Sequence, residues 1–403
     1  MAAKNILVFA DGTGNEGGLL PDESRTNVYQ LYCATRVGPD SPIEPEKQLA
    51  LYVPGVGTPI PGTASHWQQL KETAQQAYGG GITKKIIDCY VAIIGVWRPG
   101  DRIYLFGFSR GAYTVRCLAH VLELIGIPTQ EANGQPLNLD PTQLRKLSTS
   151  AVKILYRFGL PIRNAKKRDQ KAEIFRSAYK CISGPEHGAV PYFIGVWDTV
   201  AALGWAHLRA ALEWVHLWPL QYDEHFPSTV RFARHAMAVD EYRKDFVRVP
   251  WGGSGTVLPN IPGEPEQFQQ IWFAGNHADI GGSYPENESR LSDITLMWMA
   301  DFIEQLPAEG RVYIDRAVLK CSPSSAGMMH DECMVGIGGT PLRWGQTLRT
   351  VPTQAVLHET VYERLRMEEV RNFIGYGPYR PASLQNHEKT KQFYQGLPGG
   401  TPP

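Results

Sequence analysis

The sequence IYLFGFSRGAYTVRCL, residues 103–118, places an apolar run before a glycine-rich turn and a helix-compatible segment. Its centre, GFSRG at 107–111, fits the pattern G-x-S-x-G. A serine on a sharp strand-to-helix turn has a strained backbone, so the residues two before and two after it must lack bulky side chains, and Gly107 and Gly111 meet that need. The stretch predicts a strand over 102–106, a helix over 112–123 and Ser109 as a nucleophile between them. A glycine-rich turn with a structural serine is the alternative.

Four further runs have the composition of buried strands that end at glycine or at polar residues. They span residues 6–10, 49–53, 192–197 and 270–274. Apolar residues at helical spacing over 83–97 and 289–306 lie between or after them. Buried strands that alternate with helices predict an α/β fold with a mainly parallel sheet flanked by helices. Ligands bind such sheets at the carboxyl ends of the strands.

Length and composition set the scale of the fold. The chain has 403 residues, 43% of them hydrophobic and 10% aromatic, as in globular proteins. This length exceeds the roughly 250–300 residues at which one core usually stops growing. We expect a catalytic domain over residues 1–377 with helical insertions at about 130–190 and 203–235, followed by a loosely held tail over 378–403.

Charge and cysteine usage exclude several classes of protein. Forty basic residues balance forty acidic ones, which argues against nucleic-acid binding and against electrostatic docking to acidic lipid. The six cysteines are scattered and imply neither a zinc site nor a disulfide scaffold. The apolar stretch 6–10 is too short for a signal peptide, and no run reaches the ~20 apolar residues of a spanning helix. A cytoplasmic location is the default expectation, export without a signal stays open, and nothing indicates the oligomeric state.

A serine nucleophile needs two partners, because its hydroxyl is weak at neutral pH without a histidine base that a carboxylate orients. Asp198 directly follows the strand-like run 193–197, and His277 follows 271–274 and precedes a helix. Ser109, Asp198 and His277 therefore have the chain order of α/β-hydrolases, nucleophile, acid and base. The alternatives are a helix cap for Asp198 and a buried, backbone-bonded histidine for His277.

Rival residues exist for both partners. Asp240 lies in a segment that reads as helical, where an ion pair or a cap is its expected role. Asp279 stands two residues past His277 and is expected to shape that loop. His358, near the start of a late helix, is the runner-up base.

Acyl transfer also needs donors for the oxyanion. One is expected to be the backbone N–H of Arg110, the residue after the nucleophile. The second is expected from the DGTG loop at 11–14, through Gly12 or Thr13, whose glycines allow close approach of a bound ester. The alternative is a tight turn that Asp11 organises. A phosphatase site is disfavoured, because Thr13 stands where a second metal-binding aspartate is needed.

Four ordered motifs carry a family resemblance: VFADGTGN at 8–15, GFSRGAY at 107–113, GVWDTV at 195–200 and HADIGG at 277–282. Together they resemble the uncharacterised α/β-hydrolase family that includes the first class of type VI secretion phospholipase effectors, over about residues 5–305. The resemblance implies a Ser-Asp-His esterase with Ser109, Asp198 and His277 at the matching positions. The secreted phospholipases usually carry large additional regions for membrane contact or delivery, and this chain stops soon after the catalytic part. Toxin activity and a bilayer substrate therefore do not follow from the resemblance.

Residues 203–220 form an amphipathic pattern directly after the proposed acid. Its wide apolar face would suit a lid or an acyl-chain wall, and Trp205, Trp214 and Trp218 would suit peripheral contact with a membrane. Packing of this face on the core is the plainer interpretation. The loop over 58–81 is another candidate border of the entrance.

The sequence thus predicts a serine hydrolase of carboxylic esters that works through an acyl-enzyme, with no metal and no organic cofactor. The resemblance favours a lipid or phospholipid ester. A small soluble ester, acyl transfer to an acceptor other than water, and a non-catalytic interaction module remain alternatives.

Overall fold

The structure is a computed structural model that describes residues 3–12, 24–55, 80–157, 165–200, 227, 229–244, 246, 248–251, 262–337, 340–343, 345–372 and 375–395. Three expectations lie outside these residues: the amphipathic segment 203–220 with its three tryptophans, most of the loop 58–81, and Thr13 of the predicted oxyanion loop. None of the described helices is long and apolar enough to cross a bilayer.

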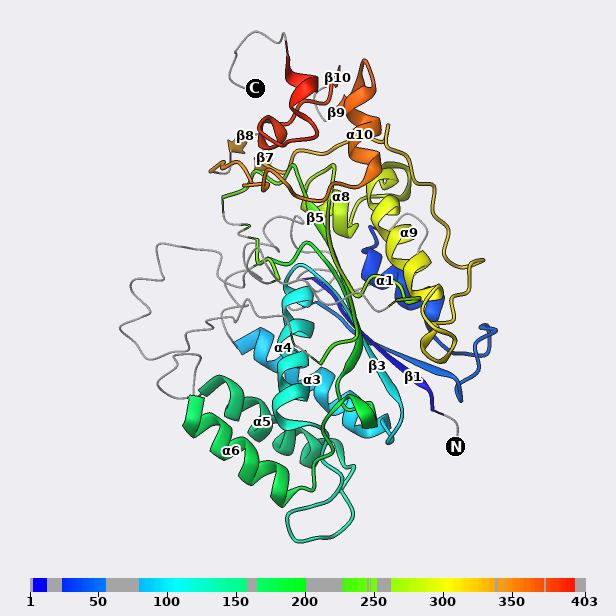
Figure 1. Cartoon of the computed structure of the whole chain (residues 1–403), viewed down its shortest axis with the longest axis vertical. Helices are drawn as coiled ribbons and strands as arrows, with labels where there is room; N and C mark the ends of the chain where they lie inside the picture. Colours follow the sequence, from blue (N-terminus) through cyan, green and yellow to red (C-terminus); the bar gives the residue numbers. More distant parts are fainter. Residues whose placement is uncertain are drawn as a thin grey trace.

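A parallel six-stranded sheet forms the centre of the described fold (Figure 1). Its strand order is β2 (Gln48–Val53), β1 (Asn5–Ala10), β3 (Arg102–Phe108), β4 (Pro191–Trp197), β5 (Phe232–Ala238) and β6 (Phe268–Phe273). The predicted α/β fold and all five predicted strands are confirmed.

Of the six strands in this sheet, β5 is the one that the sequence did not predict. Its sequence FARHAMA holds no β-branched residue, so it lacks the usual propensity signal of a strand. Tertiary packing decides instead, because all seven residues are buried between β4 and β6. The helical interpretation around Asp240 is therefore wrong: Ala238 ends a strand, and Asp240 lies just past it.

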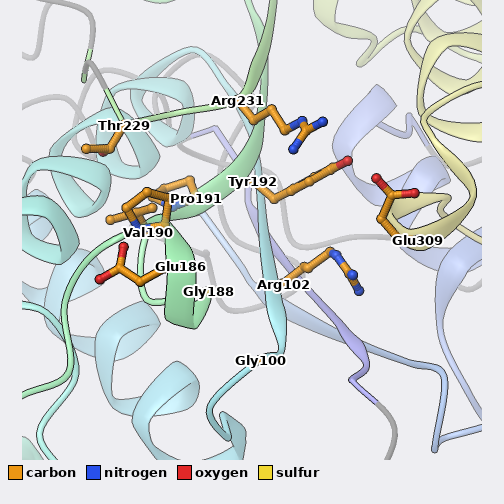
Figure 2. Close-up of a pocket in the computed structure, with 11 residues that line it drawn as sticks. Gly100, Arg102, Glu186, Gly188, Val190, Pro191, Tyr192, Thr229, Arg231 and Glu309 are labelled. Atoms are coloured by element: carbon orange, nitrogen blue, oxygen red, sulfur yellow. The ribbon is translucent and has the colours of Figure 1, made fainter. Parts of the chain in front are cut away.

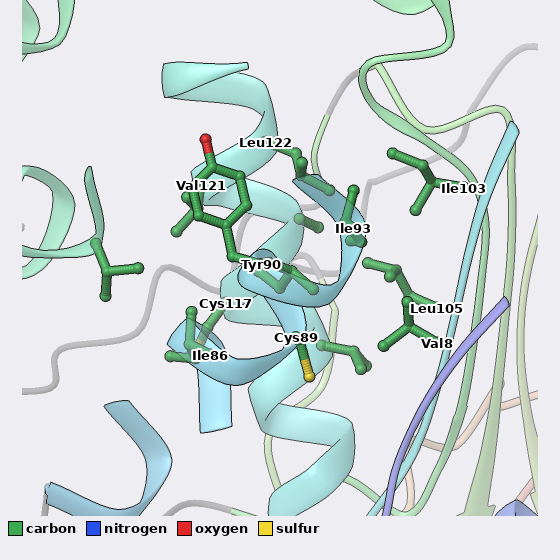
Figure 3. Packing of buried hydrophobic residues seen from close by; sticks show 14 of the residues in the cluster. Val8, Ile86, Cys89, Tyr90, Ile93, Ile103, Leu105, Cys117, Val121 and Leu122 are labelled. Atoms are coloured by element: carbon green, nitrogen blue, oxygen red, sulfur yellow. The ribbon is translucent and has the colours of Figure 1, made fainter. Parts of the chain in front are cut away.

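Helices cover both faces of the sheet. Side chains along a strand point alternately to its two faces, and here both sets are apolar and need cover. Ile6 and Val8 of β1 face a core that α3 (Gly80–Val96) and α4 (Arg110–Ile125) cover, and Figure 3 shows this packing. Leu7 and Phe9 face the opposite core, which α1 (Asn27–Thr35) and α9 (Arg290–Glu304) cover. The predicted helices over 83–97, 112–123 and 289–306 correspond to α3, α4 and α9.

Two further helices, α5 (Pro141–Arg157) and α6 (Ala165–Ala178), lie in the segment 130–190. They pack outside α3 and α4 and add Leu144, Ala151 and Phe175 to the same core. The segment therefore thickens one helical layer without reaching the carboxyl ends of the strands (Figure 1).

The order of the strands places a topological switch point next to β1. The chain passes from β1 to β2 on one side and then returns to place β3 on the other side. At such a reversal, the connections that leave the two neighbouring strands diverge, and ligands bind there in open parallel sheets. The connections at this point start with Asp11 after β1 and with Ser109 after β3.

The C-terminal part lies at the carboxyl end of the sheet (Figure 1). It holds α10 (Glu359–Arg366) and two antiparallel pairs, β7 (Met334–Ile337) with β8 (Thr340–Arg343) and β9 (Val370–Asn372) with β10 (Gly375–Gly377). The N–H of Trp272 in β6 donates to the carbonyl of Val356 at 3.0 Å, so this part attaches to the sheet edge.

The end of the described chain is packed rather than loosely held. Tyr379 and Leu384 are buried in a core with α10, and the Tyr379 hydroxyl donates to Asp240 Oδ2 at 2.7 Å. The expectation of a loose tail is therefore wrong for residues 379–394. Aromatic and aliphatic side chains spaced among the polar ones anchor this segment to the core.

Candidate active site

Ser109 occupies the turn between β3 and α4 with φ 57° and ψ −123°, a left-handed φ that side chains rarely adopt. A Cβ on Gly107 would lie 2.6 Å from the backbone of Ala112, and one on Gly111 would lie 2.0 Å from the carbonyl oxygen of Ala10. Gly107 is therefore required for the turn to close on the start of α4, and Gly111 for it to close against the end of β1. The predicted strand, turn and helix around Ser109 are confirmed.

Asp198 stands at the end of the neighbouring strand β4 and is completely buried. It too has a left-handed φ of 35°, and its N–H donates to the carbonyl of Ala236 at 2.8 Å. Its Oδ1 accepts the N–H of Ala238 at 3.0 Å. The backbone and the carboxylate of Asp198 are thus both held by the neighbouring strand β5.

His277 is the first residue of α8 (His277–Gly281) and is 5% exposed. The side chain of Asn276 caps this helix by accepting the N–H of Asp279, and the Asp279 carboxylate accepts the N–H of Asn276 in turn. This pair of bonds fixes where the helix begins. The His277 Nδ1 lies 2.6 Å from Asp198 Oδ2. Its ring packs on Phe108, the residue before Ser109, with ring centroids 4.5 Å apart.

The structure therefore brings Asp198 and His277 into direct contact and places the imidazole against the nucleophile turn. Although Ser109 and His277 are both among the described residues, no hydrogen bond joins their side chains. Such bonds are often loose before a substrate is bound.

The charges at this pair set the tautomer of the histidine. Burial alone would raise the pKa of Asp198, but the charge of Arg349 and the hydrogen bond from His277 hold it well below its usual range. An ionised carboxylate only accepts, so the Nδ1 of His277 carries the proton and donates. Burial lowers the pKa of His277, and Asp198 opposes that shift only in part. A neutral imidazole with Nε2 as its free acceptor is the resulting state near pH 7.

Arg349 is the site residue that the sequence did not reveal. Its Nη1 and Nη2 donate to Asp198 Oδ1 and Oδ2 at 2.6 and 2.9 Å, in a buried two-pronged ion pair. No predicted strand and no recognised motif marks it in the sequence, and it lies 151 residues from Asp198 along the chain. Only the tertiary fold makes the pairing visible.

The first predicted oxyanion donor lies at the start of a helix. Arg110 is the first residue of α4, and an N–H at that position has no acceptor within the helix. Burial lowers the pKa of the Arg110 side chain to about 10, which leaves it charged at neutral pH.

Gly12, one of the two candidates for the second donor, is engaged elsewhere. The N–H of Gly12 donates to Asp11 Oδ1 at 2.7 Å. Asp11 is fully buried and also accepts the hydroxyls of Thr26 and Tyr52, each at 2.7 Å. Burial raises the pKa of Asp11 despite these bonds. Asp11 thus organises the loop, and Gly12 would have to release it before donating to a substrate.

A buried lysine completes this loop anchor. Lys85 of α3 donates from Nζ to the carbonyl oxygen of Asp11 at 2.7 Å, and burial lowers its pKa to about 8.

The rival residues make other contacts. Asp240 accepts the N–H of Gly275 at 2.7 Å, and burial raises its pKa to about 6. Asp279 binds His330 at 2.8 Å besides capping α8, so its expected role in shaping the loop agrees with its contacts. His358 caps α10 and stacks on Phe273 with ring centroids 4.5 Å apart. None of these bonds involves Ser109.

One cavity lies far from this site, where β3 and β4 begin (Figure 2). Its volume is about 240 Å³, and Arg102 and Arg231 lie on either side of Tyr192 in its wall. Among the described residues, no group of three or more His, Cys, Asp or Glu side chains is placed to hold a metal ion.

The parallel sheet, the serine turn at its switch point and the neighbouring Asp–His pair define an α/β-hydrolase-like protein. Residues 4–302 match the family described as "T6SS, Phospholipase effector Tle1-like, catalytic domain", and the chain belongs to this family. Membership places it in a family of phospholipase-type hydrolases, as the motif resemblance implied.

Similar proteins are longer than this chain. The uncharacterized protein YEL023C of Saccharomyces cerevisiae is 24% identical over 319 residues, which are 73% of this chain and 38% of that protein. An uncharacterized protein from Pseudomonas aeruginosa, known from a crystal structure, is 19% identical with a TM-score of 0.40, over 81% of this chain and 49% of that one. The Tle1 effector bound to the VgrG spike of the type VI secretion system is 16% identical with a TM-score of 0.34, over 72% and 53%. The chain thus spans between 38% and 53% of the length of these relatives.

Proposed function

We propose that the chain is a serine hydrolase of carboxylic esters, with Ser109 as nucleophile, His277 as base and then acid, and Asp198 as the carboxylate that orients the imidazole. The observation that carries this proposal is the 2.6 Å contact between His277 Nδ1 and Asp198 Oδ2 beside a strained serine turn. A left-handed φ in a residue other than glycine is costly for a fold, and such residues cluster at active sites.

The first half of the reaction forms an acyl-enzyme. The neutral Nε2 of His277 takes the proton of the Ser109 hydroxyl as Oγ attacks the carbonyl carbon of the ester. The negative charge then moves to the carbonyl oxygen, where the N–H of Arg110 is one donor. When the tetrahedral intermediate collapses, His277 gives its proton to the leaving alcohol.

The second half repeats these steps with water. His277 takes a proton from water, the hydroxide attacks the acyl carbon, and Ser109 recovers its proton as the carboxylic acid leaves. Throughout, the imidazole alternates between neutral and protonated forms. Asp198 stays ionised and stabilises the protonated form.

The substrate class that we propose is a phospholipid or another lipid ester. The family supports this choice, because its description is that of a phospholipase effector. The balanced charge of the chain does not favour acidic lipid over neutral lipid.

Release of fatty acid from phospholipid vesicles tests the proposal. Purified protein is incubated with phosphatidylcholine vesicles and, separately, with a soluble short-chain ester, and Ser109→Ala serves as the matched control. Hydrolysis of phospholipid by the wild type alone is the expected result. Hydrolysis of the soluble ester alone would reject the lipid substrate, and an ester product formed with added alcohol in place of free acid would indicate an acyltransferase.

No turnover of either substrate by folded protein would contradict the enzyme and favour a non-catalytic interaction module.

A further inference from the structure

The buried guanidinium of Arg349 has a specific relation to the proposed catalytic pair. It lies on the carboxylate of Asp198, whose two oxygens receive its Nη1 and Nη2 at 2.6 and 2.9 Å. Asp198 Oδ2 receives His277 Nδ1 at 2.6 Å as well, so one oxygen is shared between arginine and histidine. Arg349 and Asp198 are 7% and 0% exposed, and solvent therefore screens their interaction little.

Backbone pairing aims this arginine at the carboxylate. The segment before it runs antiparallel to residues 242–244: the N–H of Thr347 donates to Tyr242 O, and the N–H of Lys244 donates to Gly345 O, both at 2.8 Å. The segment that β5 leads into thus holds the segment that carries Arg349. Nη1 and Nη2 also lie 3.4 and 3.5 Å from the carbonyls of Ala238 and Phe246, which fixes the plane of the fork.

We propose that Arg349 is a positioning residue of the reaction: it holds the Asp198 carboxylate ionised and in the orientation that His277 uses. This inference rests on the proposed function. It also gives a catalytic purpose to a segment that lies beyond residues 4–302, the part of the chain that matches the family.

Two properties of a bidentate arginine explain how Arg349 positions the carboxylate. Its planar fork fixes both oxygens of a carboxylate at once, whereas a lysine would fix only one direction. Its positive charge also offsets part of the carboxylate charge that stabilises protonated His277. A histidine next to a carboxylate whose charge is partly offset releases its proton at lower pH than one next to an uncompensated carboxylate, which keeps the base neutral in mildly acidic conditions.

Other charged groups around the pair do not supply this compensation. Glu241 accepts the N–H of His277 at 3.2 Å, but its own charge is matched by Arg243 at 2.7 Å. His235 of β5 accepts the N–H of Thr199, the residue after Asp198, at 3.3 Å, and burial lowers its pKa to about 3, so it is neutral. Among the described groups, Arg349 alone forms an ion pair with both oxygens of Asp198.

The test compares Arg349→Met and Arg349→Lys with the wild type across pH, through the rate of labelling of Ser109 by a fluorophosphonate probe. Arg364→Met is the matched control, because Arg364 is also a buried arginine of the C-terminal part. Its Nη1 donates to the carbonyl oxygens of Ser325 and Gly327 at 2.7 and 2.8 Å. Circular dichroism and thermal melting establish that each variant is folded.

The rate of labelling is expected to rise with pH along an acidic limb, as His277 loses its proton, and then to reach a plateau. Loss of the charge in Arg349→Met is expected to raise the apparent pKa of this acidic limb by about one unit or more and to lower the plateau rate by about 10²-fold. Arg349→Lys, which keeps the charge, is expected to leave the limb near its wild-type position and to slow the plateau through lost orientation. Arg364→Met is expected to melt at lower temperature without moving the limb.

A merely structural Arg349 would make both of its variants behave like Arg364→Met, with the limb and plateau unchanged, and that result would overturn the inference. Should Arg349→Met fail to fold, an unchanged plateau in Arg349→Lys would overturn it equally. Absence of labelling in the wild type is a separate result, because it contradicts the proposed function itself.

Discussion

Replacement of Gly111 by alanine tests how the nucleophile turn is built. A Cβ at this position would lie 2.0 Å from the carbonyl oxygen of Ala10, 2.6 Å from its carbon and 2.7 Å from the carbonyl oxygen of Asp11. All three atoms belong to the backbone at the end of β1, so no side chain can rotate to make room. The turn and the strand end must separate.

The size of the effect follows from these distances. Ordinary contact begins near 3.4 Å, so the start of α4 and the end of β1 must move apart by about 1.4 Å. Overpacking of a dense interior usually costs about 1–3 kcal/mol, and we expect the upper end here because only backbone can yield. A displacement of about 1 Å at a reacting group can lower the rate by about 10²-fold. Gly111→Ala should therefore lose both stability and activity.

Urea unfolding and ester hydrolysis measure the two effects. Gly95→Ala is the matched control, because it makes the same change in α3, where nothing lies within 4 Å of the added carbon. Alanine is the better helix former by about 1 kcal/mol, so this variant should be as stable as the wild type or more so, with full activity. A Gly111→Ala protein with wild-type stability and rate would refute the close approach of the turn to β1.

Two further predictions concern the buried polar groups around the pair. Asp198→Asn should lower kcat for ester hydrolysis by about 10³–10⁴-fold, because an amide cannot hold His277 with Nδ1 protonated; a loss below tenfold in folded protein would contradict this role. For His235, burial lowers the pKa from 6.5 to about 3, so the unfolded chain binds more protons in between. The free energy of unfolding should thus fall as pH drops below 6.5, with a contribution approaching about 1.4 kcal/mol per pH unit, and His235→Gln should flatten this slope in urea titrations at pH 7, 6 and 5. Equal slopes in both proteins would contradict the burial of a neutral His235.

The sequence predicts those parts of the fold that local patterns control. Strands β1 to β4 and β6 are dense in apolar residues and end in glycine or polar residues, and the glycines around Ser109 mark its turn. Asp198 and His277 were expected from their positions after strands, and the structure places them in contact. Chain order and strand ends suffice here, because parallel strands bring their carboxyl ends to one edge.

The remainder depends on packing between distant segments. Strand β5 lacks a propensity signal and becomes a strand because its neighbours bury it. Arg349 reaches Asp198 only because residues 345–347 pair with residues 242–244. The bond from the Gly12 N–H to Asp11 is equally hidden, since the glycines of the loop indicate freedom of the backbone and not the direction of its donors.

Covalent labelling shows whether the hydroxyl of Ser109 is activated. Wild type and Ser109→Ala are treated with a fluorophosphonate probe at neutral pH, and the modified peptide is mapped by mass spectrometry. Stoichiometric modification of Ser109, absent from the alanine variant, is the predicted result. No modification of the folded wild type, or modification at another residue that persists in Ser109→Ala, would contradict the assignment of Ser109, Asp198 and His277 as a catalytic unit.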